Sequence, residues 1–236
     1  MGTSRLKWGM LAFAAVAGAG LSTAKAATIV LTFEGVGDEQ QVLNFYNGGT
    51  DSGGNSGTNY GISFDADALG LIDADAGGSG NFGGEPSPST GVFFLSGGAA
   101  IMNVAAGFDT GFSFFYSAIN SPGSVTVWDG LNGTGSVLTT LNLPLTPNTG
   151  APDPNGNFSP LLPFGVTFGG TAHSVSFAGT ANQIVFDDIT LGSATPGDQT
   201  PVVPLPAAVW GGMALLSGLG VTKRLRRRNE TELSPA

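Results

Sequence analysis

Three acidic residues near the two ends of the body are the strongest candidates for chemistry in this chain. Glu34 follows a short apolar segment, and Asp187 and Asp188 lie within another one. Between Thr28 and Thr200 the sequence has 15 Asp and Glu residues and no Lys or Arg, so a carboxylate buried there needs a bound cation or a proton. Clustered carboxylates with backbone carbonyls are the ligands that Ca²⁺ prefers. We expect a structural calcium site at these three residues, with solvated acids at strand ends as the alternative.

The arrangement of two strands decides whether that site can form. Glu34 ends the first predicted strand and the two aspartates lie in the last, so the strands must pair for the side chains to meet. Alternation along a strand places Asp187 and Asp188 on opposite faces, so one of them should join Glu34 unless a β-bulge intervenes.

Aromatic residues beside polar ones form a second candidate site, for carbohydrate. Trp and Tyr faces stack on sugar rings, while Asp and Asn bind hydroxyl groups. Trp128 and Asp129 end a predicted strand next to a glycine-rich turn, and Tyr46 and Tyr60 flank a glycine-rich loop. These four residues are the candidate carbohydrate-binding set. The alternative is that Trp128, like the phenylalanines of segment 112–115, belongs to an ordinary apolar core.

The elements that must position these residues are short strands. Gly, Ser, Thr and Asn separate β-branched and aromatic runs, several with period two, and no segment has helical periodicity. Eleven such runs are Thr28–Phe33, Tyr60–Phe64, Ala68–Ile72, Val92–Leu95, Ala100–Val104, Gly111–Ser117, Ser124–Trp128, Ser136–Leu143, Phe164–Phe168, His173–Phe177 and Gln183–Leu191. This pattern predicts an all-β body, a β-sandwich or jelly roll. The acidic loops at 65–67 and 73–75 are interpreted as solvated, since Gly84 stands where an EF-hand loop needs Glu.

Composition excludes several functions for this body. Without cations it cannot neutralise phosphates, which excludes nucleic-acid binding. Without cysteine there is no thiol chemistry, and one histidine cannot build a multi-histidine metal centre. His173 has no activating neighbour in sequence and is interpreted as a surface strand residue. We expect a non-enzyme; the alternative is a polysaccharide-active hydrolase that would lose turnover on replacement of Glu34, Glu39 or Glu85.

The N-terminal segment has the features of a secretory signal peptide. Arg5 and Lys7 precede an apolar run from Trp8 to Leu21, and Ala24–Ala26 fits the small-x-small cleavage pattern. We expect a signal helix over residues 1–26 and export through the inner membrane.

The C-terminal segment joins a proline motif, an apolar run and a basic cluster. The motif is Val203, Pro204, Leu205, Pro206 and Ala207, and the cluster includes Arg226, Arg227 and Arg228. The uncharged run 207–222 would rise about 24 Å as a short transmembrane helix with a cytoplasmic basic stop. These parts, in this order, resemble the PEP-CTERM class of sorting signals, in its VPLPA variant.

That resemblance implies processing by an exosortase-type enzyme of the inner membrane, and delivery to the surface or extracellular matrix of a Gram-negative bacterium, often one that makes exopolysaccharide. The segments 125–138 and 182–191 also resemble parts of jelly-roll bodies in other PEP-CTERM proteins, which look like carbohydrate-binding sandwiches. The expected organisation is a signal peptide (1–26), an extracellular β-sandwich (27–193), a linker (194–202), a sorting signal (203–228) and a cytoplasmic tail (229–236).

The expected function is a non-catalytic surface or biofilm-matrix protein that binds exopolysaccharide and is stabilised by calcium. The alternatives are the hydrolase above and a purely structural or adhesive matrix protein with no specific ligand.

Overall fold

The protein folds into two antiparallel sheets. A computed structural model describes residues 28–95, 99–149 and 156–198, and within them the secondary structure is eleven strands and one short 3₁₀ helix, η1 (Ala74–Ala76). The expected all-β architecture is confirmed, and the sheets are those of a β-sandwich. The expected signal helix, transmembrane helix and sorting motif lie outside the described residues.

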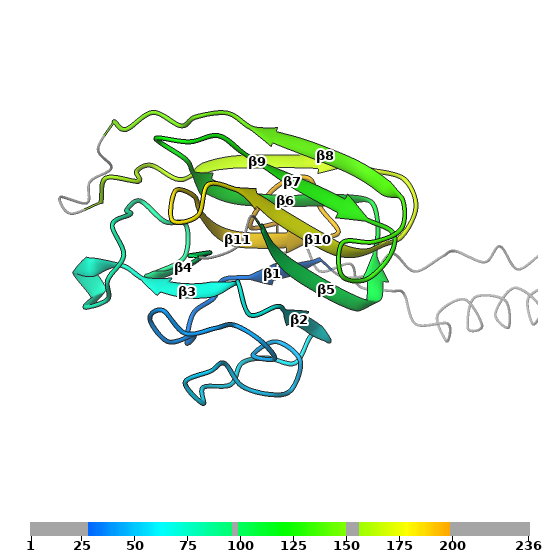
Figure 1. The fold of residues 1–236 in the computed structure, drawn as a ribbon, viewed down its shortest axis with the longest axis horizontal. Helices are drawn as coiled ribbons and strands as arrows, with labels where there is room; N and C mark the ends of the chain where they lie inside the picture. The colour runs from blue at the N-terminus through cyan, green and yellow to red at the C-terminus, as the bar shows by residue number, and fades with distance from the viewer. Residues whose placement is uncertain (1–27, 96–98, 150–155, 199–236) are drawn as a thin grey trace, which may run out of the picture.

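The strands follow the predicted segments closely. They are β1 (Ile29–Leu31), β2 (Ile62–Phe64), β3 (Leu69–Ile72), β4 (Thr90–Phe93), β5 (Ala99–Phe108), β6 (Gly111–Ser117), β7 (Gly123–Trp128), β8 (Val137–Leu143), β9 (Leu162–Thr167), β10 (Ala172–Gly179) and β11 (Val185–Leu191). Sheet A has the order β3-β4-β11-β6-β9, with β1 also pairing with β11; sheet B has the order β2-β5-β10-β7-β8 (Figure 1).

The pairing of the last eight strands is nested. β4 pairs with β11, β5 with β10, β6 with β9 and β7 with β8, so a long antiparallel hairpin is wrapped into two four-stranded layers. This wrapping is the jelly-roll arrangement. β1, β2 and β3 extend the two layers, and the pairing of β1 with β11 confirms the expected contact between first and last strands.

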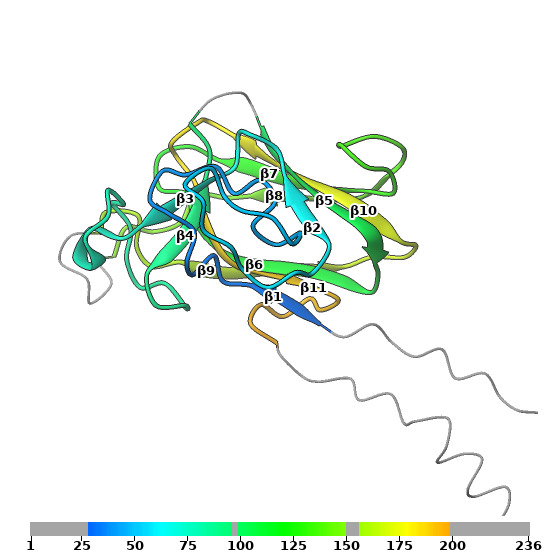
Figure 2. The same ribbon diagram turned by 90° about the horizontal axis from the view of Figure 1, so that it is seen from below.

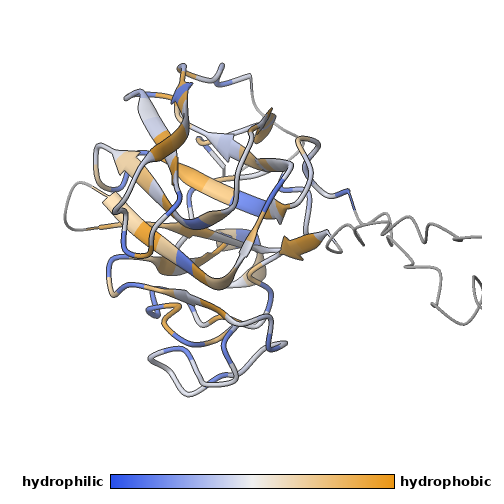
Figure 3. Ribbon diagram, turned by 90° about the vertical axis from the view of Figure 1, so that its right-hand side faces the viewer, coloured by the Kyte–Doolittle hydropathy of each residue, from blue (hydrophilic) through white to orange (hydrophobic). Residues whose placement is uncertain are grey.

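Alternating apolar residues from both layers form one main core. It contains a group of aromatic rings, among which Phe114 and Phe186 have centroids 5.4 Å apart, edge to face, and Phe177 and Phe186 5.0 Å apart. Each ring removes a large apolar area from water, and edge-to-face contacts add to that gain. Apolar residues accordingly gather in the strands and hydrophilic ones in the connecting loops (Figure 3).

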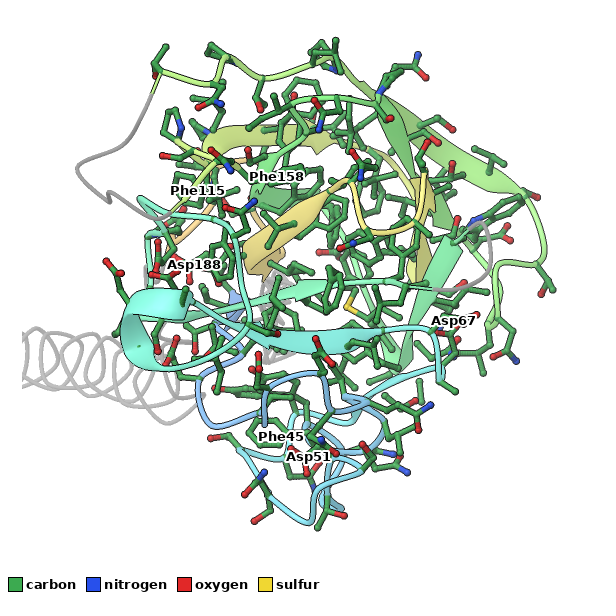
Figure 4. All side chains as sticks on the ribbon, turned by 60° about the vertical axis from the view of Figure 1, so that its left-hand side comes forward. Phe45, Asp51, Asp67, Phe115, Phe158 and Asp188 are labelled. Carbon is green, nitrogen blue, oxygen red and sulfur yellow. The ribbon has the colours of Figure 1, made fainter. Side chains whose placement is uncertain are left out.

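Two long loops cover the sandwich. The loop between β1 and β2 packs below β1, β2 and β3 (Figures 1 and 2), and carries Phe45 and Asp51 near each other (Figure 4). The loop between β3 and β4 lies on the outer face of sheet A, where Phe82 packs with Phe158 and Phe115 in a second, smaller apolar cluster.

Within the described part of the chain, no helix has the length and apolar character needed to cross a membrane.

Candidate functional site

The end of β1 and the middle of β11 bring the three predicted carboxylates into one region. Leu31 pairs with Ile189 and Val30 with Thr190, so the chain that leaves β1 passes beside residues 187 and 188. Glu34 lies three residues beyond Leu31, in the turn that follows the strand. The strand pairing that the three carboxylates need in order to lie close together is therefore present.

A β-bulge in β11 changes the expected orientation of the two aspartates. The register against β6 shifts between Asp187 and Thr190, and Asp188 has a φ of 47°, in the left-handed region. Both side chains are buried, like every other residue of β11: Asp187 is 0% exposed and Asp188 is 8% exposed. The sequence predicts only one aspartate at the site because side chains alternate along a regular strand. A β-bulge interrupts that alternation.

Asp187 is held by hydrogen-bond donors from the loop before β4 and from its own strand. The Ser87 hydroxyl donates to both carboxylate oxygens, at 3.0 and 2.8 Å, and the backbone N–H of Asp188 donates at 2.6 Å. Burial, followed by the negative charge of Asp188, raises the pKa of Asp187 to about 8. Without a cation this carboxyl group is therefore largely protonated at neutral pH.

Asp188 and Glu34 complete the group. Glu34 accepts hydrogen bonds from the backbone N–H groups of Ser89 and Thr90, at 3.0 and 2.8 Å. Asp188 Oδ1 is buried and has no hydrogen-bond partner. Burial raises the pKa of Asp188, the Ser87 hydroxyl opposes that rise, and the negative charge of Glu34 adds to it. We call Glu34, Ser87, Asp187 and Asp188 the carboxylate cluster.

The cluster fits a hard cation in its chemistry. A buried carboxylate oxygen without a donor is costly unless it is protonated or coordinates a cation, and the body has no Lys or Arg. Among the described residues, no group of three or more His, Cys, Asp and Glu side chains is arranged so that it could hold a metal ion. Other oxygens would have to contribute, and the Thr32 carbonyl, 3.3 Å from the Ser87 hydroxyl, is one nearby.

Ser87 is the part of the cluster that sequence reasoning missed. It lies 100 residues from Asp187 and 55 from Thr32. No spacing pattern links it to either, because loop packing and not strand periodicity places it there.

The predicted tyrosines have different environments. Tyr46 is 4% exposed, and its hydroxyl oxygen accepts the N–H of Phe33 at 2.7 Å. This burial corrects its assignment to a carbohydrate-binding surface: Tyr46 is a core residue. Tyr60 is 39% exposed and stacks on Tyr46 with ring centroids 6.0 Å apart.

Trp128 and Asp129 organise a hairpin. Trp128 lies outside the main core, partly exposed, and its indole N–H donates to Ser176 Oγ at 3.1 Å. Asp129 Oδ1 accepts the N–H of Ser136 at 2.6 Å and closes the turn between β7 and β8. Since β5 and β10 separate β2 from β7, the structure does not bring Trp128 next to Tyr60.

The remaining loop acids differ: Asp75 is exposed, as expected, whereas others have structural positions. Asp73 is 4% exposed, which corrects its interpretation as a solvated acid. Asp65 accepts the N–H of Ile101 at 3.0 Å and of Asp67 at 3.1 Å. Asp51 is 3% exposed; burial opposes its ionisation, but hydrogen bonds from Asn55 and Gly37 hold its pKa below the ordinary value.

No protein-family model and no curated protein sequence matches this chain.

Proposed function

We propose that this chain is a non-catalytic exported protein of the cell surface or extracellular matrix, whose jelly-roll body is completed by calcium after export. The observation that supports the proposal best is the carboxylate cluster. It joins the turn after the first strand, the last strand and the loop before β4, so a bound cation would link three distant parts of the chain.

The chemistry of the surroundings favours calcium. Extracellular calcium modules bind with dissociation constants of about 10⁻⁴–10⁻³ M, using carboxylates, carbonyls and water. Glu34, Asp187 and Asp188 would supply charged oxygens. The terminal segments, which resemble export and sorting signals, support an extracellular location, with an exosortase-type enzyme as processing partner and exopolysaccharide as the neighbouring polymer.

Thermal unfolding of residues 27–200 tests the proposal, with excess chelator compared against millimolar CaCl₂ at fixed ionic strength. Calcium at tenfold its dissociation constant stabilises a one-site protein by about 1.4 kcal/mol, which is a rise of about 3–6 °C in Tm for a body of this size. Glu34→Gln and Asp188→Asn should abolish the rise. An equal rise with MgCl₂, or none with calcium, contradicts the proposal.

A further inference from the structure

A cleft of about 390 Å³ lies on the outer face of sheet A, away from the carboxylate cluster. Apolar side chains of β3, β4 and β11 line it, and so does Phe158. Phe158 belongs to the same apolar cluster as Phe115 and lies near it (Figure 4). Its rim is polar and carries Glu39, Asn81, Asn120 and Asn182. We call it the amide cleft. Its size and its mixture of an apolar floor with a few polar groups are those of a small-ligand site.

Several rim groups retain hydrogen-bonding capacity. Glu39 Oε1 accepts the Ser79 hydroxyl at 2.9 Å, Asn81 Oδ1 accepts the N–H of Asn157 at 3.0 Å, and Asn120 Nδ2 donates to Gln183 at 3.2 Å. Among the described residues, the second oxygen of Glu39, the amino group of Asn81 and the carbonyl of Asn120 have no such partner. The rim therefore offers both acceptors and a donor from side chains that are already fixed at their other atom.

Two of these residues also have an unusual backbone. Glu39 has a φ of 55° and Asn182 a φ of 58°, and both line the cleft. Each is held there by a backbone hydrogen bond: Glu39 N–H donates to Gly70 O at 2.9 Å and Asn182 N–H to Phe94 O at 2.8 Å. Asn adopts this conformation readily, whereas a long side chain such as Glu is uncommon in it. A strained position such as Glu39 is typical of binding sites.

We propose that the amide cleft binds an uncharged oligosaccharide. Side-chain amides both donate and accept hydrogen bonds and the Glu39 carboxylate accepts them, so together they match vicinal hydroxyl groups. The partly exposed Phe158 ring offers an apolar face to a sugar ring. An anionic sugar would meet Glu39 and a body without Lys or Arg. Glu39 is the one acidic residue among the described residues that line the cleft, which fits binding rather than two-carboxylate hydrolysis.

This inference rests on the proposed extracellular role and gives it a ligand class and a site. It is tested by calorimetric titration of residues 27–200 with neutral gluco-, manno- and galacto-hexasaccharides. This fragment contains both sheets and the whole main core that lies between them. Hexagalacturonate is the anionic comparison. We expect at least one neutral hexasaccharide to bind and the anionic one not to bind.

Substitutions locate the binding. Asn182→Gly keeps the left-handed backbone and removes the amide, and should weaken binding about tenfold; Phe158→Ala should do the same. Asn132→Gly is the matched control, because Asn132 also has a positive φ, of 57°, but lies in the turn between β7 and β8. It should leave binding unchanged. Each variant is first checked for an unaltered unfolding transition. If Asn182→Gly or Phe158→Ala does not fold, Glu39→Gln replaces it as the rim variant.

The inference is overturned if no neutral hexasaccharide binds, if hexagalacturonate binds as well as the neutral sugars, or if Asn182→Gly and Asn132→Gly bind equally. Titrations run with calcium and with chelator separate this result from the proposed function. If sugar binds but Tm does not depend on calcium, the cleft proposal stands and the calcium proposal fails. If Tm depends on calcium but no sugar binds, only the cleft proposal fails.

Discussion

Asp187 is fully buried, yet its carboxylate has no basic residue as a partner. Its pKa is raised from 3.8 to about 8, so the folded state binds this proton more tightly than the unfolded chain. That contribution to stability is complete below the unfolded pKa and is lost as pH rises through the folded value. In chelator, the free energy of unfolding should therefore fall between about pH 4 and pH 8, and denaturant titrations across this range measure the fall.

Asp187→Asn gives the control for that prediction. The amide has no charge to bury, and its oxygen can still accept a hydrogen bond from the Ser87 hydroxyl. The free energy of unfolding should therefore depend less on pH in this variant. Calcium needs ionised carboxylates, and its effect on Tm in the unsubstituted protein should grow with pH. A chelated protein whose stability rises steadily toward pH 8 would contradict the assignment of a buried proton to Asp187.

Ser87 supplies the donor that Asp187 needs. Ser87→Ala leaves a buried carboxyl group with fewer partners and should destabilise the chelated protein by about 1–3 kcal/mol. Ser124→Ala, on the half-exposed side of β7, should change stability by less than about 0.5 kcal/mol. Chemical denaturation of both variants checks the difference, and equal effects would mean that the Ser87 hydroxyl is not important for the cluster.

The individual residues differ in how well sequence could predict them. Glu34 and the two aspartates stand out because they are acids beside apolar strands in a body without cations. Tyr46 could not be separated from Tyr60 by sequence, since both flank the same glycine-rich loop. Only the packing of that loop shows that one ring enters the core and the other covers it.

At the scale of elements, periodicity and turn residues predict the strands well. Each of the eleven predicted segments overlaps one strand, and Gly111–Ser117 is reproduced at both ends. β5 extends to Phe108, beyond the predicted Val104, because it continues through Gly107 at a bulge opposite β10. Bulges depend on pairing across the sheet, so neither this one nor the bulge at Asp188 is visible in sequence.

The hairpin between β7 and β8 depends on one glycine. Gly135 has a φ of 84°, and a Cβ there would overlap the Asp129 carboxylate that closes the turn. Gly135→Ala should destabilise the body by about 1–3 kcal/mol. Gly169→Ala is the control, because a Cβ at Gly169 meets nothing within 4 Å.

Trp128 reports the hairpin directly, since it is the one tryptophan in the sequence between residues 27 and 200. Denaturant unfolding followed by its fluorescence therefore compares the two glycine variants. Equal midpoints would show that the turn tolerates a side chain at Gly135 and that Asp129 does not fix it.

At the scale of the molecule, the two ends of the described chain leave the body together. β1 runs antiparallel to the end of β11, with Ile29 opposite Leu191, and Figure 2 shows both on one side. The amide cleft includes Ile184 and Val185, at the start of β11. If the body is tethered after residue 198, as the proposed sorting signal implies, the cleft lies toward the other end of β11 and faces away from the tether.

The charge of the body is also a property of the whole molecule. Its 15 carboxylic acids are spread along a segment without Lys or Arg, so their repulsion is uncompensated and acts between side chains that are not in contact. The range of such interactions falls from about 30 Å at 0.01 M salt to about 10 Å at 0.1 M. In chelator at neutral pH, Tm should therefore rise by a few degrees as NaCl increases over this range.

Repeating the scan near pH 3, where most of these acids are protonated, separates charge screening from a general salt effect, and the rise should then largely disappear. If the rise persists at low pH, or is absent at neutral pH, self-repulsion does not limit the stability of this body.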